Sequence, residues 1–110
     1  MSQTLKKFAP YLRMLHKSSP KARNALVKQH CSHDFLKCIC ECVKNVLMGN
    51  VDLSPEHKRR LKRHKRSLRK LALKKTSLTE KKRIVQSGGF LGALLGPIIK
   101  VLGSLFGASS

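Results

Sequence analysis

The chain has 110 residues and a formal net charge of +19, from 24 Lys and Arg against 5 Asp and Glu. It is therefore one small domain at most, and its self-repulsion predicts a polyanionic partner, with nucleic acid first and an anionic membrane second. The acids are scattered and no Ser/His/Asp set, phosphate loop or carboxylate pair is visible, so we predict no catalytic residues, no cofactor and no enzyme.

Three helical patterns occupy the first half and predict a small helical bundle over 1–50. Apolar residues recur at helical spacing over 3–17, and Ser19-Pro20 is a typical helix start for a second helix to about Gln29. Asp34 is the expected cap of the third and most apolar helix, which Gly49-Asn50 should end. The face expected to be buried lies between Phe35 and Leu47, and such a thin core predicts marginal stability.

Four cysteines lie in this half: Cys31, Cys38, Cys40 and Cys42. The first residues lack the apolar core of a secretory signal, which predicts a reducing compartment and free thiols. His30 and His33 lie close by, and a zinc site is an alternative. However, Cys-x-Cys-x-Cys does not match the usual ligand spacing and no second ligand pair follows, so we predict packing in the core and no metal.

A basic segment over 54–86 begins at Ser54-Pro55 and predicts a long helix, interrupted near Thr76 and Ser77. Its leucines form only a narrow stripe, so we expect it to order on a polyanion and the protein to be partly disordered. No aromatic residue lies between 37 and 89, which favours backbone neutralisation of double-stranded DNA over base stacking. A nuclear localisation signal is compatible with the same run. The predicted nucleic-acid-binding residues are Lys58, Arg59, Arg60, Lys62, Arg63, Lys65, Arg66, Arg69, Lys70, Lys74, Lys75, Lys81, Lys82 and Arg83.

The tail over 90–107 is an apolar helical pattern with a narrow stripe of small residues and Lys100. A helix of this length is about 25 Å long, which is short of a bilayer core of about 30 Å, and Pro97 should bend it. We expect a membrane-active helix, and the alternative is that the tail folds back and covers the bundle. The residues expected to contact membrane are Phe90, Leu91, Leu94, Leu95, Ile98, Ile99, Leu102, Leu105 and Phe106.

Gly88-Gly89 separates the basic segment from the tail. The order of basic segment, Gly-Gly and apolar tail resembles the precursor of the adenovirus core peptide mu, or protein X, and the membrane-lytic segment resembles that of adenovirus protein VI. Over 38–107 the chain is similar to small basic proteins of polinton (Maverick) elements and adintoviruses. Gln86, Gly88, Gly89 and Phe90 resemble the cleavage site of the adenovirus-like cysteine protease, which the resemblance makes a partner, with the cut after Gly89.

Together these features predict an all-α minor virion core protein. It would bind and condense double-stranded DNA without sequence preference, in the virion and the host nucleus, and its tail would contact membrane or capsid protein after release. One alternative is the precursor of a cationic, membrane-lytic peptide of the antimicrobial type. Another is a tail-anchored protein with a basic juxtamembrane segment.

Overall fold

Seven helices make up the chain in a computed structural model that describes residues 3–87 and 89–105, with side chains up to Val101 except that of Ser87. None of these residues forms a strand, which confirms the all-α class. The radius of gyration is 12.9 Å, close to the value of about 13 Å expected of a folded chain of this length. The helices are α1 (Gln3–Lys17), α2 (Pro20–Gln29), α3 (His33–Leu47), α4 (Pro55–Lys62), α5 (Lys65–Ala72), α6 (Leu78–Ser87) and α7 (Leu91–Leu105).

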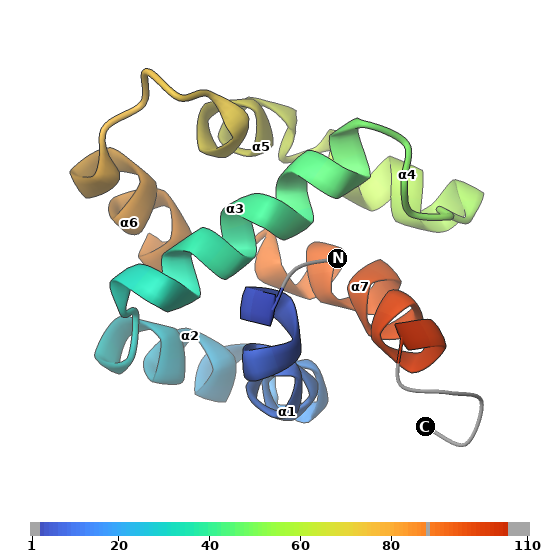
Figure 1. Cartoon of the computed structure of the whole chain (residues 1–110), viewed down its shortest axis with the longest axis horizontal. Helices are drawn as coiled ribbons and strands as arrows, with labels where there is room; N and C mark the ends of the chain where they lie inside the picture. The colour runs from blue at the N-terminus through green and yellow to red at the C-terminus, as the bar shows by residue number, and fades with distance from the viewer. Residues whose placement is uncertain (1–2, 88, 106–110) are drawn as a thin grey trace.

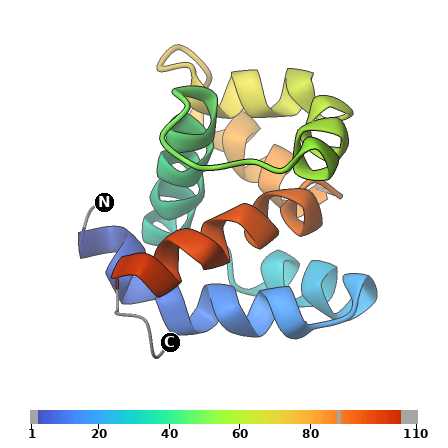
Figure 2. The same cartoon turned by 90° about the vertical axis from the view of Figure 1, so that its right-hand side faces the viewer.

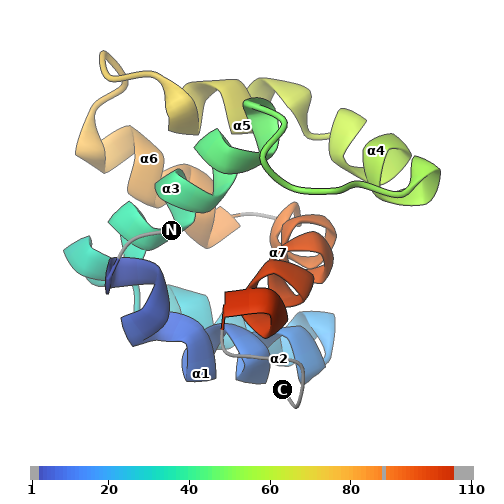
Figure 3. The same cartoon turned by 45° about the vertical axis from the view of Figure 1, so that its right-hand side comes forward.

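The helices stack in three levels, which Figure 3 shows from the side. Helices α1 and α2 form one outer level, and α4 and α5 form the other. Between them lie α3, α6 and α7, and Figure 2 shows α7 crossing the middle of the molecule with α1 below it and α4 above it. Helix α3 runs diagonally across the front of the molecule in Figure 1 and packs against α1 and α5. Every helix therefore has a neighbour on which to bury an apolar face.

Serine side chains start four of the helices. The hydroxyls of Ser19, Ser32 and Ser54 accept hydrogen bonds of 3.1–3.2 Å from backbone N–H groups three residues on, and Ser77 does the same at α6. Each satisfies one N–H that the first helical turn leaves unpaired. The predicted starts at Ser19 and Ser54 are confirmed. The predicted cap of α3 was wrong: Ser32 caps it, and Asp34 lies inside its first turn, 3.5 Å from the Lys7 ammonium.

The expected long basic helix is instead three short helices. A break at Arg63 and His64 lets α4 pack against α7 while α5 packs against α3. Leu73 then leaves the helical conformation, and a loop leads to the start of α6 at Ser77. The segment is helical without a polyanion, because its few apolar side chains share the core of the rest. The buried ones are Leu61, Leu68, Leu71, Ile84 and Val85.

The apolar tail, as far as its side chains are described, packs against the other helices. Helix α7 packs against α1, α3 and α4, and the alternative in which the tail covers the bundle is the arrangement that the structure has. One hydrophobic cluster joins residues from all three predicted segments, 1–50, 54–86 and 90–107, so they share a core. The tail contributes several of its largest fully buried side chains, which are Phe90, Leu91, Leu94, Leu95 and Ile98.

Two glycines of α7 give charged and polar side chains room to cross its backbone. The Arg23 guanidinium lies where a Cβ on Gly92 would be only 2.8 Å from its Nη1, and the His57 ring lies beside Gly96. Arg23 also donates to the carbonyl oxygens of Leu15 and Ser18, at 2.9 and 3.1 Å. It therefore satisfies carbonyl groups at the end of α1 while it covers α7.

We expect Leu94→Ala to lower the free energy of unfolding by about 2–5 kcal/mol, because a fully buried leucine is removed and a cavity is left. Lys100→Ala, on the same helix but exposed, should change it by less than about 0.5 kcal/mol. Urea unfolding followed by circular dichroism measures both. Equal, small effects of the two substitutions would show that α7 is not part of the core.

Candidate nucleic-acid interface

The predicted DNA-binding cations lie on the outside of α4, α5, α6 and the loop before α6. Of the 14 residues, 13 are exposed, and Lys81 is half-buried. Between 58 and 83 the only acid is Glu80. The structure thus brings these side chains to the surface of one folded body and leaves them accessible to a large anion.

The apolar stripe of the segment decides which way the cations point. Leu61 anchors α4, and Leu68 and Leu71, which are three residues apart, anchor α5. Residues at this spacing share one helical face, so the intervening lysines and arginines must occupy the other faces. The stripe is narrow because each helix buries only one edge. A wide arc of each helix is therefore occupied by cations. Such an arc suits contact with a broad anionic surface better than insertion of one helical face into a binding partner.

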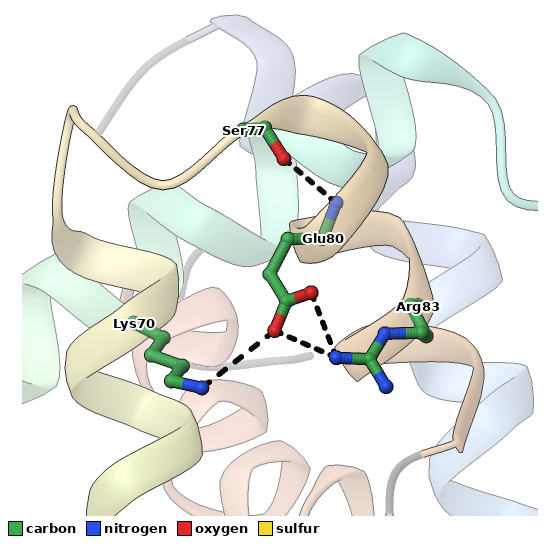
Figure 4. Close-up of polar contacts among 4 residues, drawn as sticks. All are labelled: Lys70, Ser77, Glu80 and Arg83. Carbon is green, nitrogen blue, oxygen red and sulfur yellow. Dashed lines mark hydrogen bonds and ion pairs between the residues drawn. The ribbon is translucent and has the colours of Figure 1, made fainter.

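Glu80 joins α5 to α6 and is surrounded by cations (Figure 4). Both of its carboxylate oxygens accept hydrogen bonds from Nη2 of Arg83, at 2.7 and 2.8 Å. The Lys70 ammonium of α5 lies 3.6 Å from the same carboxylate. The hydrogen bond from Arg83, aided by the charge of Lys70, holds the pKa of Glu80 below its ordinary value. The one acid of this region therefore orders two of its cations.

Helix α2 also belongs to this region, and nothing in the sequence pattern indicated it. The side-chain amide of Gln86 donates a 3.1 Å hydrogen bond to the backbone carbonyl of Lys28, 58 positions away. This contact brings the exposed Lys28 beside α6. Its position could not be inferred from spacing, because the contact depends on how α2 and α6 meet across the fold.

The residues of the predicted cleavage site differ in how exposed they are. Gln86 is helical, hydrogen-bonded and partly buried, whereas Gly89 is exposed in the turn before α7. Phe90 is only 1% exposed, and its ring centroid lies 6.4 Å from that of His64. Gly88 lies outside the described residues. A protease that binds both sides of the Gly89–Phe90 bond must therefore first draw Phe90 out of the core.

The predicted membrane-contacting residues lie mainly in the interior. Phe90, Leu91, Leu94, Leu95 and Ile98 are buried and Ile99 is partly buried, while the side chains of Leu102, Leu105 and Phe106 lie outside the described part. Within that part, no single helix has the length and apolar character to cross a bilayer. The segments 78–86 and 91–101 have that length and apolar character only when they are taken together, and the pair is bent by 95°.

The cysteines are spread over two environments. Cys38 and Cys42 are buried on α3, which confirms their predicted place in the core, and Cys31 and Cys40 are half-buried with free thiols. The hydrogen bond that Cys42 shares with Cys38, together with burial, raises the pKa of the Cys42 thiol, so it stays protonated at neutral pH. In the described ranges, no three His, Cys, Asp or Glu side chains gather as a metal site would require.

Comparisons with known proteins add no relative: no family model, curated protein or solved structure matches this chain.

Glu80→Gln should lower the thermal midpoint at pH 7, because it removes the carboxylate that Lys70 and Arg83 share. The pKa of Glu80 is lowered on folding, so its stabilising effect is present above the ordinary pKa of 4.5 and is lost as the pH falls through the lower, folded value. The difference from wild type should therefore shrink as the pH falls below 4.5 and vanish once Glu80 is protonated in the folded protein. Asp52→Asn, at an exposed acid outside this cluster, is the control. A deficit in Glu80→Gln that persists undiminished in acid would show that the carboxylate charge is not its cause.

Proposed function

We propose that this protein binds double-stranded DNA and neutralises its phosphates without reading base sequence, as a minor core protein of a virion. The observation that carries the proposal is the surface formed by residues 58–83, where 13 exposed cations accompany a single acid, Glu80. Each cation placed near a phosphate releases condensed counterions, which favours binding at low salt. This charge is far more than the few acids of the chain could balance internally.

The composition of the same surface supports binding without sequence preference. Residues 58–83 contain no Asn, Gln, Phe, Tyr or Trp, so the side chains that most often read adenine or stack on bases are absent from it. Leu61, Leu68 and Leu71 are buried in the core, whereas Leu73 and Leu78, at the two ends of the loop before α6, are exposed. Phosphate contact is an interaction that every lysine and arginine of this surface can make.

The virion setting and the releasable tail rest on the resemblance to adenovirus-like core proteins. In this proposal α7 serves two states. While the chain is intact, α7 completes the core, and its apolar face is covered by α1, α3 and α4. A cut after Gly89 would end its covalent link to α6, so the helix could leave and bind lipid through that face. Burial would keep this membrane activity latent until processing.

We expect the full-length chain to bind a mixed-sequence duplex with a logarithmic affinity that falls linearly with log salt, at about −0.9 per neutralised phosphate. The double substitution Arg66→Gln/Arg69→Gln, on exposed positions of α5, should reduce that slope by about 2, one for each lost contact. Fluorescence anisotropy over a series of salt concentrations measures the slope.

Lys6→Gln/Lys17→Gln is the matched control, since it removes the same charge from exposed positions on α1. If it reduces the slope as much as the α5 substitutions do, the binding is a property of net charge and the interface is misplaced. An affinity that ignores salt, or a strong preference for one sequence, would overturn the proposed function.

The latent tail predicts a difference before and after cleavage. The intact protein should leave lipid vesicles sealed, and the same sample cut between Gly89 and Phe90 by an adenovirus-type cysteine protease should release a trapped dye. Gly88→Val should block both the cut and the leakage, because the added side chain obstructs a narrow protease cleft. Mass spectrometry checks the cut and dye fluorescence the leakage. Equal leakage from cut and intact protein would contradict latency.

A further inference from the structure

An open groove of about 760 Å³ lies between α2 and α6. Every side chain that lines it is cationic or can donate a hydrogen bond, and no acidic or apolar residue contributes. Ligand sites for uncharged organic molecules are lined mainly by apolar and aromatic groups, so this lining indicates an anion instead. The residues are Asn24, Lys28, Thr79, Lys82, Arg83 and Gln86.

The two walls of the groove are regular stripes on neighbouring helices. Asn24 and Lys28 are four residues apart on α2, and the α6 residues recur at three- and four-residue steps, so each set shares one face. The hydrogen bond from Gln86 to the Lys28 carbonyl joins the walls at one end. Beneath them, Val27 and Val85 are each 1% exposed and belong to the core. The groove is therefore supported by packed helices, not formed by a loop.

Three cations share this groove without an acid among the lining residues. Arg83 is partly neutralised by Glu80, but both of its hydrogen bonds to that carboxylate come from Nη2, so among the described residues its Nε and Nη1 donors have no acceptor. Glu80 therefore holds the guanidinium in place while leaving a donor edge for another anion. The ammonium groups of Lys28 and Lys82 form no ion pair within the described part of the chain. An anion in the groove would relieve the repulsion among these charges.

We propose that phosphodiester groups of bound double-stranded DNA occupy the α2–α6 groove, so that Asn24 and Lys28 of α2 form part of the DNA interface. This rests on the proposed function and extends it from the basic segment to a helix that the sequence pattern left out. Backbone oxygens of DNA match the lining, since they accept hydrogen bonds from ammonium, guanidinium, amide and hydroxyl groups alike. The groove fixes where one edge of the duplex lies on the protein.

The test compares Lys28→Gln with Lys100→Gln in the full-length protein. Both substitutions remove one exposed cation. Lys28→Gln should leave the fold intact, because Gln86 bonds to the backbone carbonyl of Lys28, and the Lys28 ammonium forms no ion pair within the described residues. Lys28→Gln should lower the salt slope for duplex binding by about 1, and Lys100→Gln should leave it unchanged. Equal effects of the two would overturn the groove as a DNA site.

A second readout follows the side-chain amide signals of Asn24 and Gln86 by NMR during titration with the same duplex. Both should shift, whereas the amide signal of Asn50, which donates to Asn45 outside the groove, should not. Signals that stay in place with DNA, or that shift only with anionic vesicles, would overturn the proposal. If Arg66→Gln/Arg69→Gln weakens binding and Lys28→Gln does not, the groove is not a DNA site, and the proposed function still stands. If the wild type shows no salt-dependent binding, the proposed function fails with it.

Discussion

Burial of the apolar face of α7 is the interaction on which the rest of the structure depends. A chain with a net charge of +19 repels itself, and although α3 packs directly on α5 and α2 on α6, helix α4 packs on α7. Helix α7 packs against α1, α3 and α4 and places Phe90, Leu94 and Ile98 at the centre of the core. The free energy gained from apolar burial is roughly proportional to the buried area and does not depend on the sign of the surface charge, so it can offset a repulsion that salt only partly screens.

The same core explains the form of the interface. Because α4 and α5 each bury one leucine edge, their cations are held outward on short, fixed helices before any DNA is present. The repulsion among these cations destabilises the folded protein when no polyanion is bound, and a bound polyanion would remove that repulsion. Under the proposed function, DNA would therefore stabilise the fold, since a ligand that binds only the folded state raises its stability by mass action. Glu80 reduces that cost locally, between Lys70 and Arg83.

Local signals were sufficient for most of the elements. Ser-Pro pairs marked the starts of α2 and α4, and apolar periodicity located α1, α3 and α7, because caps and faces depend on residues close in sequence. Which helices pack against each other could not be predicted from local signals. The apolar face of α7 fits lipid or protein equally well, and only the fold places it against α1. The break at His64 and the meeting of Lys28 with Gln86 are likewise consequences of packing between distant segments.

Amide hydrogen exchange of the full-length protein tests the central claim most directly, because it reports which helices open together. If α7 belongs to the core, the amides of Leu94 and Ile98 should exchange as slowly as those of Cys42 and Val43 on α3, and all four should exchange through the same global unfolding. Leu94 and Ile98 amides that exchange at the rate of an unfolded peptide, while α3 stays protected, would contradict the account.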